Sequence, residues 1–265
     1  MRRLLLLAVL LGGLSVPAQA QTIWSRPYEP NQIAVEAIIP EFPSDGVSFW
    51  SGGTFLTLTR SFNDNLELVT ELPVARYAAG ETSATAVGNP YIGLGLSSTS
   101  KPLLLELGVR IPAVPSNQAL QAGRRADAGR TAAFRDEAFS ASALLNGRLA
   151  LGRRTTVRLR SGLSYASENR PEAEGRKGAW RLPYSAQLWR TGDQFLTGFS
   201  LVGRPVLTDS PLNEGRSTHR AVFSVMLNGK TVQPGLLLGT GLNALFSDGE
   251  FRWIGGLTLS ISYLR

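Results

Sequence analysis

The side chains that most often carry catalysis are scarce in this sequence. It contains no cysteine and a single histidine, His219, within the run Ser217-Thr218-His219-Arg220. Nucleophilic hydrolysis needs a base such as histidine beside the nucleophile, usually oriented by a carboxylate. No carboxylate adjoins His219, and its neighbour Arg220 is a cation. We therefore expect His219 to be a residue at a loop edge and the protein not to be an enzyme.

Two other candidate sites are incomplete. Gly229-Lys230-Thr231 resembles the end of a phosphate-binding loop, but Ser224 stands where that motif requires its first glycine. Asn228-Gly229 is instead typical of a tight turn between two strands. No group of His, Asp and Glu has metal-ligand spacing, which leaves loop carboxylates such as Asp136 and Glu137 as candidate cation ligands. We expect no cofactor.

The N-terminus and the charge balance indicate an exported, basic protein. Arg2 and Arg3 precede an apolar run that ends at Ala18-Gln19-Ala20, which is the pattern of a cleaved secretory signal peptide. We predict a signal peptide over 1–20 and one domain over 21–265. The chain carries 27 Lys and Arg against 20 Asp and Glu, and it stays basic without the two N-terminal arginines. In an exported chain this excess favours anionic solutes or lipopolysaccharide phosphates as partners, and not nucleic acid.

Apolar and polar residues alternate along most of the mature chain. In the segment 103–111 every odd position is apolar, whereas the even positions include Glu106 and Arg110. Segments 155–165 and 251–264 alternate in the same way. Successive side chains of a strand point to opposite faces, so each segment has one apolar and one polar face. Helical periodicity is weak and confined to 118–137.

About 12 such segments are predicted to be strands, and most have the roughly 9–11 residues that a tilted strand needs to cross a membrane. They lie near 32–39, 53–61, 66–77, 89–97, 103–111, 139–149, 155–165, 179–189, 195–204, 218–227, 232–243 and 251–264. Short polar connections alternate with longer ones, as periplasmic turns alternate with outer loops in outer-membrane barrels. The sequence therefore predicts an all-β, transmembrane, antiparallel up-and-down β-barrel of about 12 strands in a bacterial outer membrane. A soluble periplasmic β-sandwich is the alternative.

Aromatic residues and the last strand agree with a barrel. Aromatic side chains form girdles at both membrane interfaces of such proteins. The candidates near predicted strand ends are Tyr77, Tyr165, Trp180, Trp189, Phe195, Phe251, Trp253 and Tyr263. The last strand resembles the C-terminal targeting signal of outer-membrane barrels, although Leu264 and Arg265 follow Tyr263. That resemblance implies the outer-membrane barrel assembly machinery as a partner, besides outer-membrane lipid and lipopolysaccharide.

The polar face of each strand is predicted to line the inside of the barrel. A charge on the lipid side is costly, about 2–4 kcal/mol for arginine at mid-depth, so charged residues belong inside. The predicted acidic pore-lining residues are Glu36, Glu67, Glu71 and Glu106, and the basic ones are Arg110, Arg148, Arg158, Arg160, Arg181, Arg204, Arg220 and Arg252. Acidic residues therefore line one wall and basic residues the remainder.

These charges support two interpretations. Opposed charges across a narrow pore would orient polar solutes and, with arginine in excess, favour anions. Alternatively, the same groups pair across the interior and plug it, because buried charges need partners. The loop 118–135, with Arg124, Arg125, Arg130 and Arg135, is open between three roles: an inward gate, a contact with lipopolysaccharide phosphates, or a solvated flexible loop.

Three segments resemble a known family. Glu-Leu-Pro-Val-Ala-Arg-Tyr at 71–77, Gly-Asn-Pro-Tyr-Ile-Gly-Leu at 88–94 and Leu-Gly-Val-Arg-Ile-Pro at 107–112 are similar to strands of the outer-membrane transporter family labelled as meta-pathway phenol-degradation proteins. The resemblance covers roughly residues 65–115 and implies a small passive or facilitated channel, without assigning a phenolic solute. Outer-membrane phospholipases and lipid A deacylases carry a His-x-Ser-Asn-like run that this sequence lacks.

The predicted function is a narrow channel or transporter for small polar or anionic solutes. The alternative is a structural or surface-binding outer-membrane barrel without transport, in which the loops carry the function.

Overall fold

The computed structural model describes residues 31–41, 46–98, 101–113, 118–127, 130–135, 139–168, 177–208, 217–242 and 253–263. The predicted signal peptide, and Arg252 and Phe251 among the predicted site and girdle residues, lie outside the described residues.

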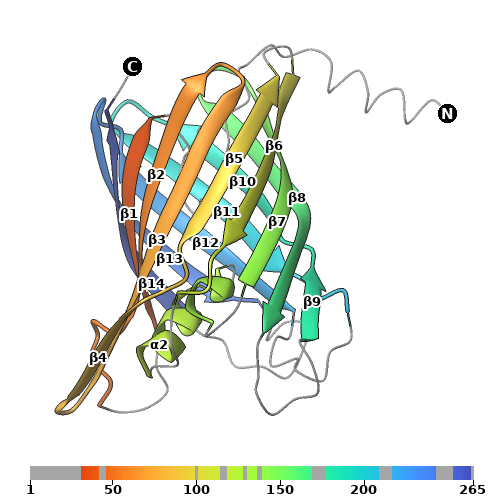
Figure 1. The fold of residues 1–265 in the computed structure, drawn as a ribbon. Helices are drawn as coiled ribbons and strands as arrows, with labels where there is room; N and C mark the ends of the chain where they lie inside the picture. The colour runs from red at the N-terminus through yellow and green to blue at the C-terminus, as the bar shows by residue number, and fades with distance from the viewer. Residues whose placement is uncertain are drawn as a thin grey trace.

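The described strands form one closed antiparallel barrel (Figure 1). The strands are β1 (Gln32–Pro40), β2 (Gly52–Asn63), β3 (Leu66–Ala79), β4 (Thr82–Val87), β5 (Tyr91–Ser98), β6 (Lys101–Arg110), β7 (Phe139–Ala150), β8 (Thr155–Glu168), β9 (Lys177–Arg181), β10 (Tyr184–Thr191), β11 (Phe195–Arg204), β12 (Thr218–Leu227), β13 (Val232–Gly241) and β14 (Trp253–Ser262). Each strand pairs with the next along the chain, except at β4–β5 and β9–β10, where β5 pairs with β3 and β10 pairs with β8 instead. β14 pairs with β1, so the sheet has no open edge.

The barrel has 12 strand positions, because two pairs of segments share one position each. β3 pairs with both β4 and β5, and β8 pairs with both β9 and β10. Pro90 lies in the first interruption and Pro183 in the second. Proline has no backbone N–H to donate to the ladder, which explains why each strand breaks there. The predicted up-and-down barrel of about 12 strands is confirmed.

The two ends of the barrel differ. The first residue of β1, Gln32, pairs with Ser262 and Thr59, close to the short β2–β3 turn at Asp64 and Asn65. The β3–β4 hairpin and the helix α2 lie at the opposite end (Figure 1). In outer-membrane barrels the end with short turns faces the periplasm, so the hairpin and α2 belong to the outer end.

The two faces of the sheet are inverted relative to a soluble protein. Outward-facing apolar residues such as Leu159 and Leu257 are half exposed, whereas the inward-facing Glu106 and Arg160 are buried. Soluble proteins bury their large apolar residues and leave charged ones in water. This inversion is the pattern of a barrel with lipid outside, and it excludes the soluble sandwich.

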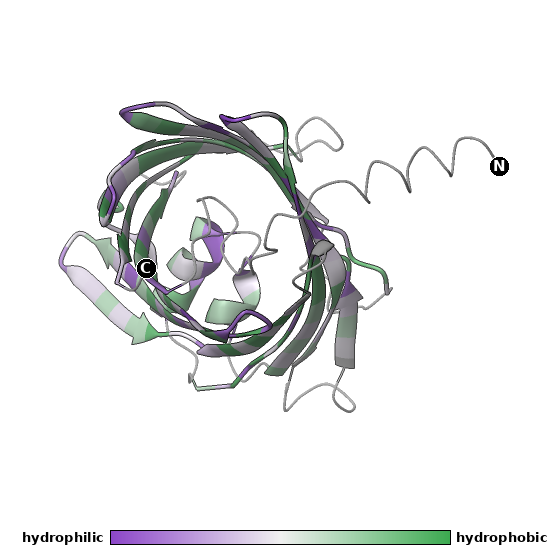
Figure 2. Cartoon of the chain, turned by 90° about the horizontal axis from the view of Figure 1, so that it is seen from above, coloured by the Kyte–Doolittle hydropathy of each residue, from purple (hydrophilic) through white to green (hydrophobic). Residues whose placement is uncertain are grey.

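The segment between β6 and β7 folds into the lumen. Seen along the barrel axis, its helices lie inside the ring of strands (Figure 2). They are α2 (Gln118–Ala126) and the short 3-10 helix η1 (Thr131–Phe134). We call the described residues 118–127 and 130–135 the plug. A helix of nine residues is marginal alone in water, and α2 is stabilised by burying Leu120 and its alanine neighbours against β1–β4. No helix among the described residues is long and apolar enough to span a membrane.

The predicted aromatic girdle holds in part. Trp180, Phe195 and Trp253 are about half exposed on the outer surface. Trp189 was assigned wrongly, because it is buried and points inward. Its indole Nε1 donates to Gln187 Oε1 at 3.1 Å, so it belongs to the polar face of β10 and not to the lipid face.

Candidate functional site

The plug packs tightly against the wall formed by β1–β5. The Phe134 ring contacts the Phe55 ring edge-on, with centroids 5.4 Å apart. A Cβ atom at Gly88 would collide with the Ala133 carbonyl oxygen and with Pro73. Glycine is therefore needed at position 88 for the plug to approach the wall this closely.

Asn89 fastens the plug through its side chain and its backbone. The Asn89 Nδ2 group donates to the carbonyl oxygens of Ala132 at 3.0 Å and Arg135 at 2.6 Å. Its backbone N–H donates to the Ala133 carbonyl at 2.6 Å, and its Oδ1 accepts from the N–H of Ala113 at 2.9 Å. These bonds satisfy backbone groups that would otherwise be buried without partners.

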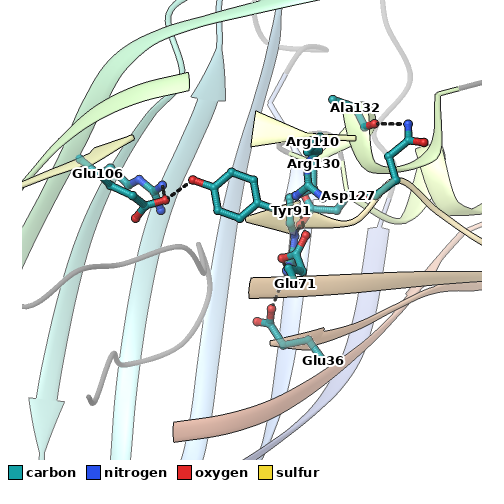
Figure 3. A network of polar contacts seen from close by, with 10 residues as sticks. Glu36, Glu71, Tyr91, Glu106, Arg110, Asp127, Arg130 and Ala132 are labelled. Atoms are coloured by element: carbon teal, nitrogen blue, oxygen red, sulfur yellow. Dashed lines mark hydrogen bonds and ion pairs between the residues drawn. The ribbon is translucent and has the colours of Figure 1, made fainter. Parts of the chain in front are cut away.

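Arg130 of the plug is the centre of a buried ion network (Figure 3). Its Nη1 lies 2.9 Å from Glu36 Oε2 and 3.1 Å from Glu71 Oε2, and its Nε lies 2.7 Å from Asp127 Oδ2. The guanidinium carbon also lies 3.6 Å from the centroid of the Phe55 ring, a distance for a cation–π contact. Burial alone lowers the pKa of Arg130, but the three carboxylates outweigh burial and raise it above its ordinary value. Arg130 is therefore a permanent cation that is shared by Glu36 and Glu71 of the acidic wall and by Asp127 of the plug.

Asp127 joins the plug to the other side of the barrel. Its second carboxylate oxygen, Oδ1, lies 3.0 Å from Nη2 of Arg220 on β12. One carboxylate thus contacts an arginine of its own segment and an arginine of the basic wall. The plug is held at two sides of the lumen.

The three segments that resemble the transporter family meet beside the plug. Arg110 pairs with Glu71 and donates to the backbone carbonyl of Asn89 at 3.1 Å. Tyr91 donates its hydroxyl to Glu106, which also pairs with Arg160 at 3.1 Å. Residues from each of the three segments therefore build the wall that receives the plug.

A cavity of about 80 Å³ lies between the plug and the inner face of β3, β5–β9 and β11, and the carboxylate residue Glu71 is among its lining residues. Among its lining residues are four arginines of the wall, Arg110, Arg160, Arg181 and Arg204. Arg110 and Arg160 have the carboxylate partners described above. Arg181 and Arg204 are buried, and neither forms an ion pair with a carboxylate in the described part of the chain. This cavity is the candidate site.

The other predicted lumen residues also lie on the inner face. Glu36, Glu67, Glu71, Glu106, Arg158 and Arg220 are buried there. Arg148 is half-buried and sits opposite Arg158 in the β7–β8 ladder, so the two share a face. That these residues line a conducting pore stays a prediction.

The sequence did not indicate the roles of Asp127, Asn89 and Tyr91. The signal available for Asp127 was a lone carboxylate among Arg124, Arg125 and Arg130, a composition that suits a segment bridging two charged walls. Asn89 and Tyr91 were noted for their resemblance to a family and not for their contacts.

The remaining candidates have structural surroundings. His219 is the second residue of β12, at the loop edge as predicted, and its Nδ1 lies 2.8 Å from the Tyr184 hydroxyl. Gly229 lies in the turn between β12 and β13, as its turn motif predicts. The described residues contain no cluster of three or more metal-ligating side chains, and Asp136 and Glu137 lie outside them.

Comparisons with known proteins identify the type of barrel. No protein-family model and no curated protein matches the sequence. Among solved structures, the COG4313 outer-membrane channel from Pseudomonas putida F1 aligns with a TM-score of 0.56 and 12% identity, over 92% of this chain and 100% of that one. The NanC porin aligns with a TM-score of 0.55 and 7% identity, over 87% and 100%.

A third structure, the KdgM porin in complex with disordered oligogalacturonate, aligns with a TM-score of 0.52 and 10% identity, over 88% and 99%. At these identities the likeness shows the fold, which is that of small outer-membrane channel barrels. The chain therefore has a channel-like outer-membrane fold, while its family and its solute are matters for proposal.

Proposed function

We propose that the protein is a narrow outer-membrane channel for small polar or anionic solutes. The observation that carries the proposal is the unequal neutralisation of the two walls. Glu36 and Glu71 on the acidic wall are bound by the plug residue Arg130. On the basic wall, Arg181 and Arg204 line a cavity and have no carboxylate within ion-pair distance among the described residues. A passage lined by uncompensated guanidiniums attracts anions and repels cations.

The plug makes the proposed channel narrow. It occupies the lumen at the outer end and leaves a cavity of about 80 Å³ beside it. Folded porins of larger strand number leave a wide aqueous channel. We therefore expect a small conductance, and preference among solutes by charge as well as by size.

The solved neighbours lend limited support. KdgM was crystallised with an oligogalacturonate, which is an anionic sugar chain, and the other two structures are a porin and an outer-membrane channel. The predicted absence of enzyme activity accords with these neighbours and stays a prediction, as do the barrel assembly machinery and lipopolysaccharide as partners.

Planar-bilayer recording tests the function. The folded full-length protein is expected to give discrete conductance steps, with a reversal potential in a salt gradient that reports anion preference. Folding is verified by faster migration of the unboiled sample on a gel. A folded protein without any conductance would reject the channel, and cation preference would reject the role of the arginines.

The second candidate is a barrel without transport, which the close packing of the plug favours. Gly88 permits close packing of the plug against the wall, and Asn89 binds the plug by hydrogen bonds, as expected for a purely structural segment. This candidate predicts no conductance from the native protein, together with conductance from a variant whose plug is detached, such as Arg130→Ala.

A further inference from the structure

We infer that Arg181 and Arg204 form a binding site for a compact oxyanion, the carboxylate or phosphate group of a small solute. The inference rests on the proposed function in that the site lies in the lumen. It adds the chemical class of the solute and the two residues that recognise it.

The fold brings the two arginines together on one inner surface. Arg181 ends β9 and Arg204 ends β11. An isolated antiparallel bridge pairs Arg181 with Val206, two residues beyond Arg204. Diagonal neighbours of this kind in a sheet have Cα atoms about 7–8 Å apart, within reach of long side chains. Both side chains line the same cavity.

The two guanidiniums differ from the other lumen arginines of the network. Arg110, Arg130, Arg160 and Arg220 each have a carboxylate within ion-pair distance. Arg181 and Arg204 are 3% and 8% exposed, and neither has a carboxylate within ion-pair distance among the described residues. Buried charges are normally paired, because leaving water is costly. A bound anion would stabilise these two buried cations, for which the described residues supply no carboxylate within ion-pair distance.

The cavity selects the kind of anion. Its volume of about 80 Å³ holds several water molecules, so a carboxylate or phosphate group can enter by displacing them. Each guanidinium presents a planar fork of donors that matches two oxygens of such a group. Ser140, Ser142 and Ser164 are also among the lining residues, and serine hydroxyls can donate to an anion. A larger solute would place one oxyanion group here and keep the rest of the molecule in the lumen.

Isothermal titration calorimetry on the folded full chain in a non-ionic detergent tests the site without requiring transport. The probes are inorganic phosphate and succinate. We expect at least one to bind, and Arg181→Gln and Arg204→Gln each to weaken binding by about tenfold to hundredfold, since each removes a charge-assisted contact. The control variant is Arg190→Gln. It removes an exposed arginine from β10, which shares a strand position with β9, and it is expected to leave binding unchanged.

Thermal unfolding provides a second readout, in which the arginine substitutions are expected to raise stability although they weaken anion binding. Without an anion, replacing an unpaired buried arginine by glutamine is expected to raise the melting temperature, and added anion is expected to raise it in the native protein alone. If only phosphate binds, the site is assigned to phosphorylated solutes. If only succinate binds, it is assigned to carboxylates, and if both bind, it accepts either kind of oxyanion. Binding of neither probe, or equal losses in Arg190→Gln, would overturn the site. A conducting channel that binds neither anion rejects the site only, and a site without conductance rejects the channel only.

Discussion

The two walls of the lumen carry opposite charges, and the charged side chains of the two walls differ in whether they have ion-pair partners. On the acidic wall, Glu36 and Glu71 meet Arg130 of the plug at 2.9 and 3.1 Å, so their charges are paired. On the basic wall, Arg181 and Arg204 face a cavity. Buried charges that satisfy one another fix a structure, whereas buried charges that face a cavity are available to a ligand. One wall therefore anchors the plug, and the other is the wall to which we assign the proposed solute site.

Removing the central cation should break the acidic wall. Arg130→Ala leaves three buried carboxylates without their shared partner, and breaking a buried ion pair costs about 3–5 kcal/mol. We expect detachment of the plug, a lower melting temperature and a larger single-channel conductance. Arg125→Ala, which removes an exposed arginine from helix α2 of the plug, is the matched control. Unchanged conductance and stability in Arg130→Ala would remove the distinction between the walls.

Removing the carboxylate that pairs with an arginine of the basic wall should sharpen the contrast between the two walls. Glu106→Gln takes away the charge that pairs with Arg160, and hydrogen bonds to charged groups contribute about 1.5–3 kcal/mol. We expect a smaller loss of stability than for Arg130→Ala and a reversal potential shifted toward anions. Asp193→Asn, at an exposed turn, serves as the control for loss of one negative charge. A shift toward cations would contradict the assignment of Arg160 to the solute path.

A milder change tests the hydrogen bond that orients Glu106. Tyr91→Phe removes the hydroxyl that donates to this carboxylate, and we expect a loss of about 1 kcal/mol in the free energy of unfolding. Tyr263→Phe removes a hydroxyl that donates to the backbone carbonyl of Thr59 near the barrel end. Denaturant titration measures the loss of stability in both variants. The reversal potential separates the two sites, because the anion preference should change in the first variant and stay constant in the second.

The smallest effect is expected away from both walls. Arg154 and Asp193 pair at 3.1 Å, but their side chains are 62% and 84% exposed. Exposed ion pairs contribute about 0.2–1 kcal/mol and are screened by salt. Arg154→Ala should therefore alter the melting temperature only slightly and leave the conductance unchanged. A large loss of conductance would show that turns at the periplasmic end, and not the lumen, limit the current.

The sequence predicted the barrel well because its evidence is local. Alternation of period two assigns a face to every residue of a strand, so Glu106 and Arg160 could be placed inside from their neighbours alone. The same rule, applied to Trp189, places it beside Gln187 on the inner face, and the girdle assignment failed because it considered the strand end and ignored the alternation.

The plug could not be derived in the same way. Its helix is short and rich in arginine, which suits a solvated loop as well as a buried segment. What stabilises it inside is contact with Glu36, which is 94 residues away from Arg130 in the sequence. The unpaired state of Arg181 and Arg204 has the same origin, since it depends on which carboxylates the folded plug brings to which wall.

Asp127 and Arg130 connect strands that are far apart in the sequence. Arg130 reaches back 94 residues to Glu36, and Asp127 is reached by Arg220 from 93 residues further along the chain. The plug therefore cross-links β1 and β3 to β12 through the lumen, in addition to the pairing of β14 with β1 that closes the sheet. Loss of the Asp127 carboxylate would remove this cross-link on the β12 side and take one carboxylate partner from Arg130.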